Sequence, residues 1–116
     1  VFDNASLAAL WSSISTPVGL SSWFADDVIV DGEIYTFMWN KSGQNAELLQ
    51  MRLNKYVRFK WEEEDDKTFF ELKLSQNELT NDIVLTISDF SEPDELEDAI
   101  DLWNTQIEQL RINLGL

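Results

Sequence analysis

The spacing of apolar residues changes twice along the chain, and this change constrains the fold more than any other feature of the sequence. Apolar residues first recur at the intervals of a helix face, then alternate with polar residues from residue 27, and return to the helical interval after residue 91. A helix repeats every ~3.6 residues and a strand every ~2. The order therefore predicts helices, then strands, then one final helix.

Two short helices are predicted before the alternating region. The first covers residues 6–14, and its stripe carries Leu7, Leu10, Trp11 and Ile14. The second covers residues 17–24, because Thr16 is a good N-cap and Pro17 suits the first position of a helix. This second helix is expected to bury Leu20, Trp23 and Phe24.

About six strands are predicted between the helices. Their apolar residues alternate within residues 27–31, 34–39, 46–53, 57–61, 70–74 and 81–87. Asp31 and Gly32 indicate a hairpin turn, and residues 40–45 have the composition of a loop. The buried face of the third strand is expected to carry Leu49, Met51 and Leu53.

The hairpin between residues 57–61 and 70–74 allows a prediction of its register. The register that keeps six apolar side chains on one face pairs Trp61 with Phe70, Phe59 with Leu72 and Val57 with Leu74. It also places Lys60 opposite Glu71, which is a favourable pair. The acidic residues 62–66 lack the ligand spacing and the central glycine of a calcium loop, so we expect a solvated hairpin tip.

The last helix begins near residues 91–94, with acids in its first turns as the helix dipole favours. Its apolar stripe carries Leu96, Ile100, Trp103, Ile107, Leu110 and Leu114. Such a stripe predicts that one whole face of the helix packs on something long. The fold class is therefore α+β, with an antiparallel sheet that has helices on one side.

The first two residues, Val1 and Phe2, are typical of the end of a strand, and no Met begins the sequence. We therefore expect an N-terminal strand that is truncated at its start, with the two short helices after it. Such a strand would bring the sheet from about six strands to about seven.

Composition limits the classes of function. The 116 residues fit one domain over 1–116. Eight bases against 22 acids leave a net charge of −14, so we expect no nucleic acid and no membrane as a partner. Without Cys and His there is no disulfide, thiolate or imidazole base, and we predict no cofactor, metal or catalytic residue. A cytoplasmic location is predicted, since no membrane span or signal peptide is visible.

The sharpest motif covers residues 16–24, Thr-Pro-Val-Gly-Leu-Ser-Ser-Trp-Phe, and is followed by Asp31-Gly32. With the C-terminal segment 90–114 it resembles the START-like superfamily (SRPBCC, helix-grip), in the branch related to the activator of the heat-shock chaperone ATPase. A small bacterial START-like group carries nearly this pattern, and the resemblance covers nearly the whole chain. It implies a curved sheet of six to seven strands wrapped around the long C-terminal helix, with two short helices after the first strand.

The same resemblance implies a space between sheet and helix that can hold a hydrophobic ligand. Some members of the superfamily are cyclases or hydrolases, many only bind, and the chaperone-activating members act through protein contacts. The sequence contains no recognisable catalytic motif, so no catalytic residue is carried over and an enzyme is the less favoured class.

The candidate ligand-binding residues are the apolar and aromatic side chains expected between the sheet and the last helix. They are Trp23, Tyr35, Phe37, Trp39, Phe59, Trp61, Phe70, Ile100 and Trp103. Two interpretations stay open: these residues line a cavity, or they fill the core and leave none. Trp39 and Trp61 lie at strand ends, where the mouth of a cavity would be.

Three hypotheses of function follow. The first is non-enzymatic binding of a small hydrophobic ligand between the sheet and the C-terminal helix. The second is a protein-interaction module with a filled core, which would bind a basic protein partner or form a homodimer. Its motive is the stretch 17–24 together with an acidic ridge that a basic partner could bind, whereas a homodimer would form through an edge strand or the long helix. We define the acidic ridge as Asp94, Glu95, Glu97, Asp98 and Asp101. The third and weakest is a carboxylate-based enzyme of the cyclase or hydrolase kind.

Overall fold

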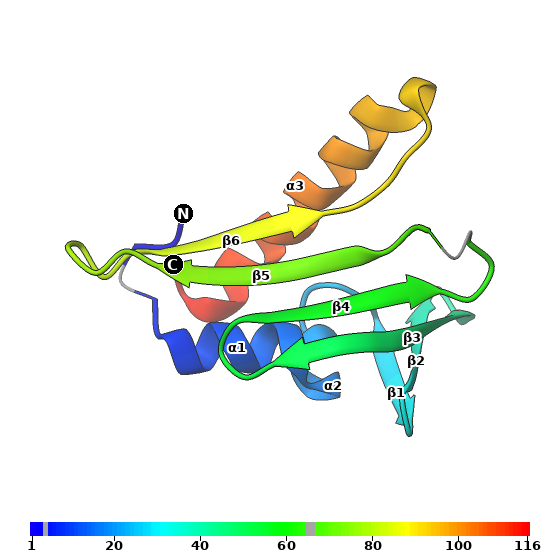
Figure 1. Cartoon of the computed structure of the whole chain (residues 1–116), viewed down its shortest axis with the longest axis horizontal. Coiled ribbons are helices and arrows are strands. Elements are labelled where there is room, and N and C mark those ends of the chain that lie inside the picture. Colours follow the sequence, from blue (N-terminus) through cyan, green and yellow to red (C-terminus); the bar gives the residue numbers. More distant parts are fainter. Residues whose placement is uncertain (4, 65–66) are drawn as a thin grey trace.

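The computed structural model describes residues 1–3, 5–64 and 67–116. Two short helices come first, six strands follow, and a long helix ends the chain (Figure 1). In chain order the elements are α1 (Leu7–Ser15), α2 (Pro17–Leu20), β1 (Asp27–Asp31), β2 (Ile34–Trp39), β3 (Ser42–Arg52), β4 (Tyr56–Trp61), β5 (Phe70–Gln76), β6 (Ile83–Ser88), η1 (Pro93–Glu95) and α3 (Leu96–Leu114). This order confirms the predicted α+β class.

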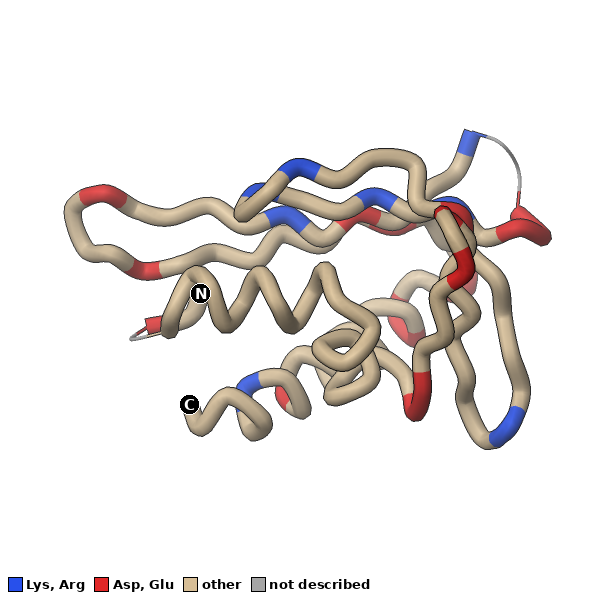
Figure 2. The backbone as a smooth tube through the Cα atoms, turned by 90° about the horizontal axis from the view of Figure 1, so that it is seen from below, with Lys and Arg blue, Asp and Glu red and all other residues tan. Residues whose placement is uncertain are grey.

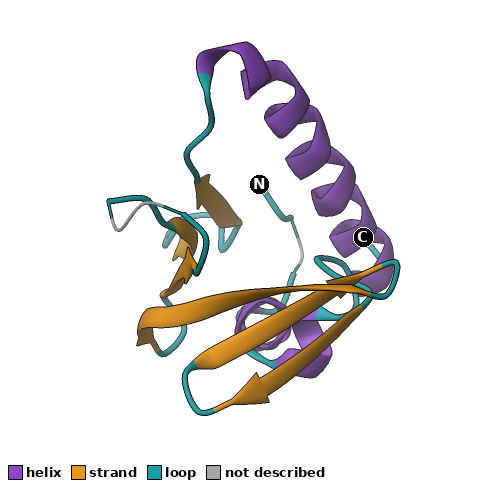
Figure 3. Cartoon of the chain, turned by 90° about the vertical axis from the view of Figure 1, so that its right-hand side faces the viewer, coloured by secondary structure: helices purple, strands orange, loops and turns teal. Residues whose placement is uncertain are grey.

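The six strands form one antiparallel sheet in which every strand pairs with its neighbours in sequence, so β1 and β6 are its two edges. Figure 2 shows α1 and α3 on the same side of this sheet. Figure 3 shows that the sheet is strongly curved and that α3 diverges from it toward the N-terminal end of the helix. The arrangement is a helix-grip fold.

Each of the two N-terminal helices begins at an N-cap, and that of the second helix is the predicted Thr16. The Ser6 hydroxyl accepts a hydrogen bond from the Ala9 N–H at 3.2 Å, and the Thr16 hydroxyl accepts one from the Gly19 N–H at 2.9 Å. The second helix ends at Leu20 rather than at residue 24, and turns follow it. Close packing joins the two helices, because a Cβ atom on Gly19 would lie 1.9 Å from the Ser12 carbonyl oxygen.

The strand predicted over residues 46–53 exists, but its start and its buried face were wrong. It begins at Ser42, inside the predicted loop, and the side chain it buries completely is Ala46. The expected buried residues are exposed: Leu49 by 44%, Met51 by 40% and Leu53 by 72%. A register irregularity between Leu48 and Gln50 disrupts the alternation there.

The predicted register of the β4–β5 hairpin was wrong by two residues, although its buried face was right. Phe59 pairs with Phe70, and Arg58, rather than Lys60, lies opposite Glu71. Arg58 explains this choice, because its Nε and Nη2 atoms donate to Glu71 Oε2 at 3.0 and 2.7 Å. Its guanidinium also lies 4.5 Å from the ring centre of Phe69. Asp65 and Asp66 of the predicted acidic tip lie outside the described residues.

The apolar stripe of α3 packs over only part of its length. Leu110 is fully buried, whereas Leu96 is 52% and Ile100 is 50% exposed, so the prediction of one fully packed face was wrong. The reason is the divergence of α3 from the sheet (Figure 3), which leaves the first turns of the stripe uncovered. Gly115, with φ 76°, ends the helix in the left-handed conformation.

The C-terminal half of α3 is hydrogen-bonded to the N-terminal part of the chain. The Gln106 side chain donates to the Phe24 carbonyl at 3.0 Å, and Asn113 donates to the Ser22 carbonyl. Arg111 donates to the Val1 carbonyl and places its guanidinium 4.4 Å from the ring centre of Phe2. These contacts set the position of the helix over the sheet.

Replacement of Gly19 by Ala is expected to lower the free energy of unfolding by more than about 2 kcal/mol, since the added methyl group meets rigid backbone of α1. Chemical denaturation measures this change. The matched control is Gly32→Ala in the β1–β2 turn, where φ is +61° and nothing lies within 4 Å of the new atom. That change should cost only about 1 kcal/mol, through backbone strain. Equal losses in the two variants would contradict the close-packing argument.

Candidate functional site

The ring of Phe24 is the centre of an aromatic cluster between the sheet and α3. Its ring centre lies 5.1–5.7 Å from five other ring centres, those of Trp23, Phe37, Trp39, Phe70 and Trp103. Its carbonyl accepts hydrogen bonds from Trp39 Nε1 and Gln106 Nε2, both at 3.0 Å. The sheet, the turn after α2 and the last helix therefore meet at one residue.

A hollow of about 430 Å³ opens beside this cluster, where the ends of β2 and β4 approach α3. We call it the tryptophan hollow; it is lined by Phe24, Trp39, Gln44, Trp61, Glu63, Glu64, Phe70, Asp89, Leu102, Trp103 and Gln106. The rings of Trp39 and Trp61 are 6.1 Å apart, and Trp61 stacks on Phe70 at 5.0 Å. Three indoles from β2, β4 and α3 thus border one space.

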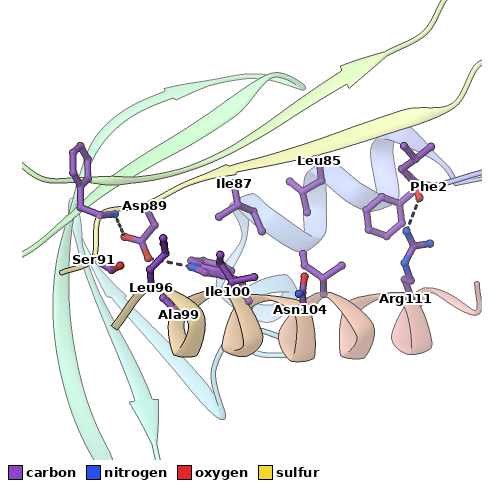
Figure 4. Close-up of a pocket in the computed structure, with 14 residues that line it drawn as sticks. Phe2, Leu85, Ile87, Asp89, Ser91, Leu96, Ala99, Ile100, Asn104 and Arg111 are labelled. Carbon is purple, nitrogen blue, oxygen red and sulfur yellow. Dashed lines mark hydrogen bonds between the residues drawn. The ribbon is translucent and has the colours of Figure 1, made fainter. Parts of the chain in front are cut away.

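A second hollow, of about 590 Å³, lies between β6 and the diverging part of α3 (Figure 4). We call it the edge hollow; it is lined by Val1, Phe2, Leu85, Ile87, Asp89, Phe90, Ser91, Leu96, Ala99, Ile100, Trp103, Asn104, Ile107 and Arg111. Figure 4 shows Leu85 and Ile87 of β6 on one side and Ile100 of α3 on the other. Polar residues lie at both ends of the edge hollow: Asp89 and Ser91 at one end, and Arg111 at the other end.

Trp103 and Asp89 line both hollows. Trp103 Nε1 donates to Asp89 Oδ2 at 3.0 Å, and the Phe90 N–H donates to Asp89 Oδ1 at 2.8 Å. The ring of Trp103 also stacks on Phe24, with 21° between the planes. This hydrogen-bonded pair therefore forms the boundary between the two spaces.

The candidate residues predicted from sequence divide into three groups. Trp39, Trp61, Phe70 and Trp103 line the tryptophan hollow, and Ile100 and Trp103 line the edge hollow. Trp23, Tyr35, Phe37 and Phe59 are buried among other rings and line neither hollow. The buried part of the set fills the core, and ligand contact by any of the nine residues stays a prediction.

Sequence reasoning missed several residues that line the two hollows. Gln44 fell inside a predicted loop, and Leu102 lies outside the apolar stripe of the last helix. Leu85 and Ile87 were placed only within the last predicted strand, and Leu96 only in the apolar stripe of the last helix. Their periodicity did indicate the apolar face, which was the available signal, but it does not show whether another element covers that face.

The charges around the tryptophan hollow are negative. Its described lining contains the carboxylates of Glu63, Glu64 and Asp89 and no Lys or Arg. Arg111 is the one basic residue among those lining the edge hollow. Within residues 1–3, 5–64 and 67–116, no group of three acidic side chains is arranged to hold a metal ion. No helix in the described part of the chain is long and apolar enough to cross a membrane.

A curved antiparallel sheet with a long C-terminal helix over one face and apolar hollows between them defines the class of helix-grip α+β proteins. The family model of the START-like superfamily domain matches residues 3–116. The chain therefore belongs to the START-like superfamily, as its sequence motif predicted. A comparison with curated proteins found no match.

Several solved structures resemble this chain. BfR322 from Bacteroides fragilis is 42% identical, with 94% of this chain and 84% of that chain covered and a TM-score of 0.65. The Aha1 dimer from Colwellia psychrerythraea is 20% identical, with 98% and 91% covered and a TM-score of 0.77. BH1534 from Bacillus halodurans is also 20% identical, with 98% and 92% covered and a TM-score of 0.74. The last two likenesses support the fold alone.

Burial in the aromatic core raises the pKa of Tyr35 above its ordinary value of 10.0, because burial disfavours the charged phenolate. As the pH rises, the unfolded chain therefore ionises this group before the folded protein does. The contribution of Tyr35 to the free energy of unfolding is complete below pH 10.0 and falls as the pH rises from 10.0 toward the raised pKa. The variant Tyr35→Phe should lose less stability between pH 8 and pH 11 than the unmodified protein, as denaturant titrations measure. An identical loss of stability in both proteins would contradict a raised pKa for Tyr35.

Proposed function

We propose that this protein binds a small hydrophobic molecule in the tryptophan hollow and does not transform it. The observation that carries the proposal is the approach of Trp39, Trp61 and Trp103, from three separate elements, to one open space. Ring surfaces of this size are usually buried in a core, so their exposure to a common hollow favours a binding role. The START-like superfamily often binds hydrophobic ligands, which supports the same conclusion.

The size and charge of the hollow narrow the ligand class. A volume of about 430 Å³ lies toward the small end of the range for ligand pockets, about 300–1,000 Å³. The aromatic core beneath the hollow is filled by buried side chains, so a ligand could occupy only the outer part of the space between the sheet and α3. The carboxylates of Glu63, Glu64 and Asp89 would repel an anionic head group, and the chain carries a net charge of −14. We therefore propose an uncharged or cationic hydrophobic molecule rather than a fatty acid.

Replacement of Trp39 or Trp61 by Ala should weaken binding of Nile red, an uncharged hydrophobic probe, by about fivefold or more, because each change removes an aromatic wall. Fluorescence titration measures the affinity, and denaturation of each variant shows how much it destabilises the fold. The matched control is Trp11→Ala, since Trp11 is partly buried on α1 and lines neither hollow. If both hollow variants bind as tightly as the unmodified protein, the site is misplaced.

Native mass spectrometry of freshly purified protein is the direct search for a natural ligand. An extra mass that disappears on denaturation would support the proposal and show what to extract. The same spectrum reports the number of protein chains in the assembly. It therefore also tests the second candidate function, that of a protein-interaction module.

The exposed acidic ridge favours that second candidate. Its five carboxylates are all exposed, on η1 and the first turns of α3. The one basic residue of α3 is Arg111, near the C-terminal end of the helix. A basic protein surface could therefore dock on the ridge without meeting a like charge on the same helix.

If the ridge binds a basic partner, the triple variant Glu97→Gln, Asp98→Asn and Asp101→Asn should lose partners that the unmodified protein captures. Their capture should also weaken with added salt, which screens exposed charges. The control variant is Glu108→Gln, on the same helix but beyond the ridge. An unchanged set of captured proteins after neutralisation of the ridge would exclude this candidate.

A further inference from the structure

The Lys and Arg residues of this acidic chain gather on one part of the sheet. Five of the eight lie on β3, β4, β5 or the turn that joins β3 to β4: Arg52, Lys55, Arg58, Lys60 and Lys73. Figure 2 shows most of the basic positions along the sheet rather than on the helices. Arg58 is paired with Glu71, and Lys60 lies opposite Glu47 in the next strand.

The three remaining bases line a single hollow of about 440 Å³, where β3 ends and β4 begins. We call it the basic hollow; its walls include Arg52, Lys55, Lys73, Leu7, Tyr56 and Leu74. The described lining contains no Asp or Glu, although the chain has 22 acids and only eight bases. In the part of the chain that the structure describes, none of the three bases has an ion pair or a side-chain hydrogen bond. No carboxylate therefore neutralises the positive charge of this hollow.

Strand pairing determines where two of the three bases lie. Arg52 pairs with Tyr56 across β3 and β4, and Tyr56 pairs with Lys73 across β4 and β5. Residues that pair in antiparallel strands have their side chains on the same face of the sheet. Because neighbouring strands are ~4.8 Å apart, the backbones of Arg52 and Lys73 are about 10 Å apart, with Tyr56 between them.

The third base is positioned by the turn between β3 and β4. The Lys55 N–H donates to the Arg52 carbonyl at 2.9 Å, and the Lys55 carbonyl accepts a hydrogen bond from the Leu74 N–H at 2.7 Å. Asn54 has a φ of 61°, a left-handed conformation that Asn tolerates in turns. The backbone of Lys55 is therefore held at both its N–H and its C=O group, beside β5.

The basic hollow also has an apolar wall. Leu74 is buried in the core, Leu7 packs against the same core, and Tyr56 is half-buried. An inorganic anion would contact the three bases and leave this wall in water, whereas a neutral hydrocarbon would cover the wall and leave the charges unpaired. The lining therefore matches a molecule that has both an anionic group and an apolar part.

We propose that the basic hollow binds a small organic anion, in which a carboxylate or phosphate group is attached to a short apolar body. The Arg52 guanidinium can hold such a group through two parallel hydrogen bonds, and Lys55 and Lys73 add compact positive charges. The apolar body would pack on Tyr56 and Leu74. The basic hollow shares no lining residue with the tryptophan hollow and has the opposite charge, so the two sites are independent.

The charge of the whole chain favours a small ligand over a macromolecule. At physiological salt, charges more than about 8 Å apart are largely screened, so a small anion in the hollow responds mainly to the three bases. A nucleic acid, an anionic membrane or a second copy of this chain would also face the acidic surface beyond the hollow. The net charge of −14 opposes the approach of such large anionic surfaces.

Phenyl phosphate is a suitable probe, because it joins a phosphate group to one aromatic ring. In an NMR titration of the unmodified protein, the largest shifts should occur at the amides of Lys55, Tyr56 and Leu74. Phenyl phosphate should bind about tenfold or more tightly than inorganic phosphate, which lacks the ring, and than benzyl alcohol, which lacks the charge. Equal affinity for either control compound, or unchanged signals at these amides, would overturn the proposal.

The variants Lys55→Gln and Lys73→Gln should each weaken binding of phenyl phosphate by about fivefold or more, because each removes one of the three charges. The matched control is Lys41→Gln, since Lys41 is exposed in the β2–β3 turn and lines none of the three hollows described. Thermal unfolding of each variant verifies that the fold is kept. Equal losses of affinity in all three variants would show an effect of overall charge alone and would overturn the site.

Two further titrations identify the class of ligand and the location of the site. A hexaglutamate peptide should bind less tightly than phenyl phosphate, and tighter binding of the peptide at the same amides would replace the small molecule with an acidic protein partner. Saturating phenyl phosphate should leave the affinity for Nile red unchanged. Displacement of Nile red would place phenyl phosphate in the tryptophan hollow and overturn the proposal.

Discussion

The rest of the structure depends on the burial of Phe24. Phe24 lies in the turn after α2, and its ring packs between the sheet and α3 and contacts both. Its carbonyl accepts hydrogen bonds from Trp39 and Gln106. A buried carbonyl without any partner would cost about 1–3 kcal/mol, and the Trp39 indole and the Gln106 amide each supply a donor that avoids this cost. These hydrogen bonds position Trp39 and Gln106, and the stacking of Trp103 on the Phe24 ring positions Trp103. The walls of the tryptophan hollow are therefore a product of core packing.

Periodicity was enough to predict most elements of the fold and insufficient for register. Moving one strand by two residues leaves every side chain on its original face, so apolar alternation alone cannot distinguish the Phe59–Phe70 pair from the pair predicted. The bidentate Arg58–Glu71 contact decides between them. The buried face of β3 failed for a different reason: Ala46 contributes little to an apolar pattern, yet it pairs with both Tyr35 and Trp61 and leaves room for their rings.

The candidate site was predictable only in part. The strand-end positions of Trp39 and Trp61 indicated the mouth of a hollow, and both residues line one. Whether an aromatic set fills a core or encloses a space depends on the distances between its rings, which residue spacing does not contain. The uncovered side chains of Leu96 and Ile100 were likewise invisible, because a helical stripe has the same sequence whether the helix follows the sheet or diverges from it. The divergence of a helix from a sheet is determined by tertiary packing, which local residue spacing does not encode.

The anchoring of α3 has a consequence for biosynthesis. The helix is held by residues from the opposite end of the chain, since Gln106 bonds to Phe24, Asn113 to Ser22 and Arg111 to Val1. A ribosome delivers the chain from its N-terminus, so all six strands emerge before the 19 residues of α3. The aromatic face of the sheet therefore stays uncovered until α3 has been translated. In the nascent chain, the apolar face of the sheet is therefore open to chaperones and prone to aggregation until α3 folds over it.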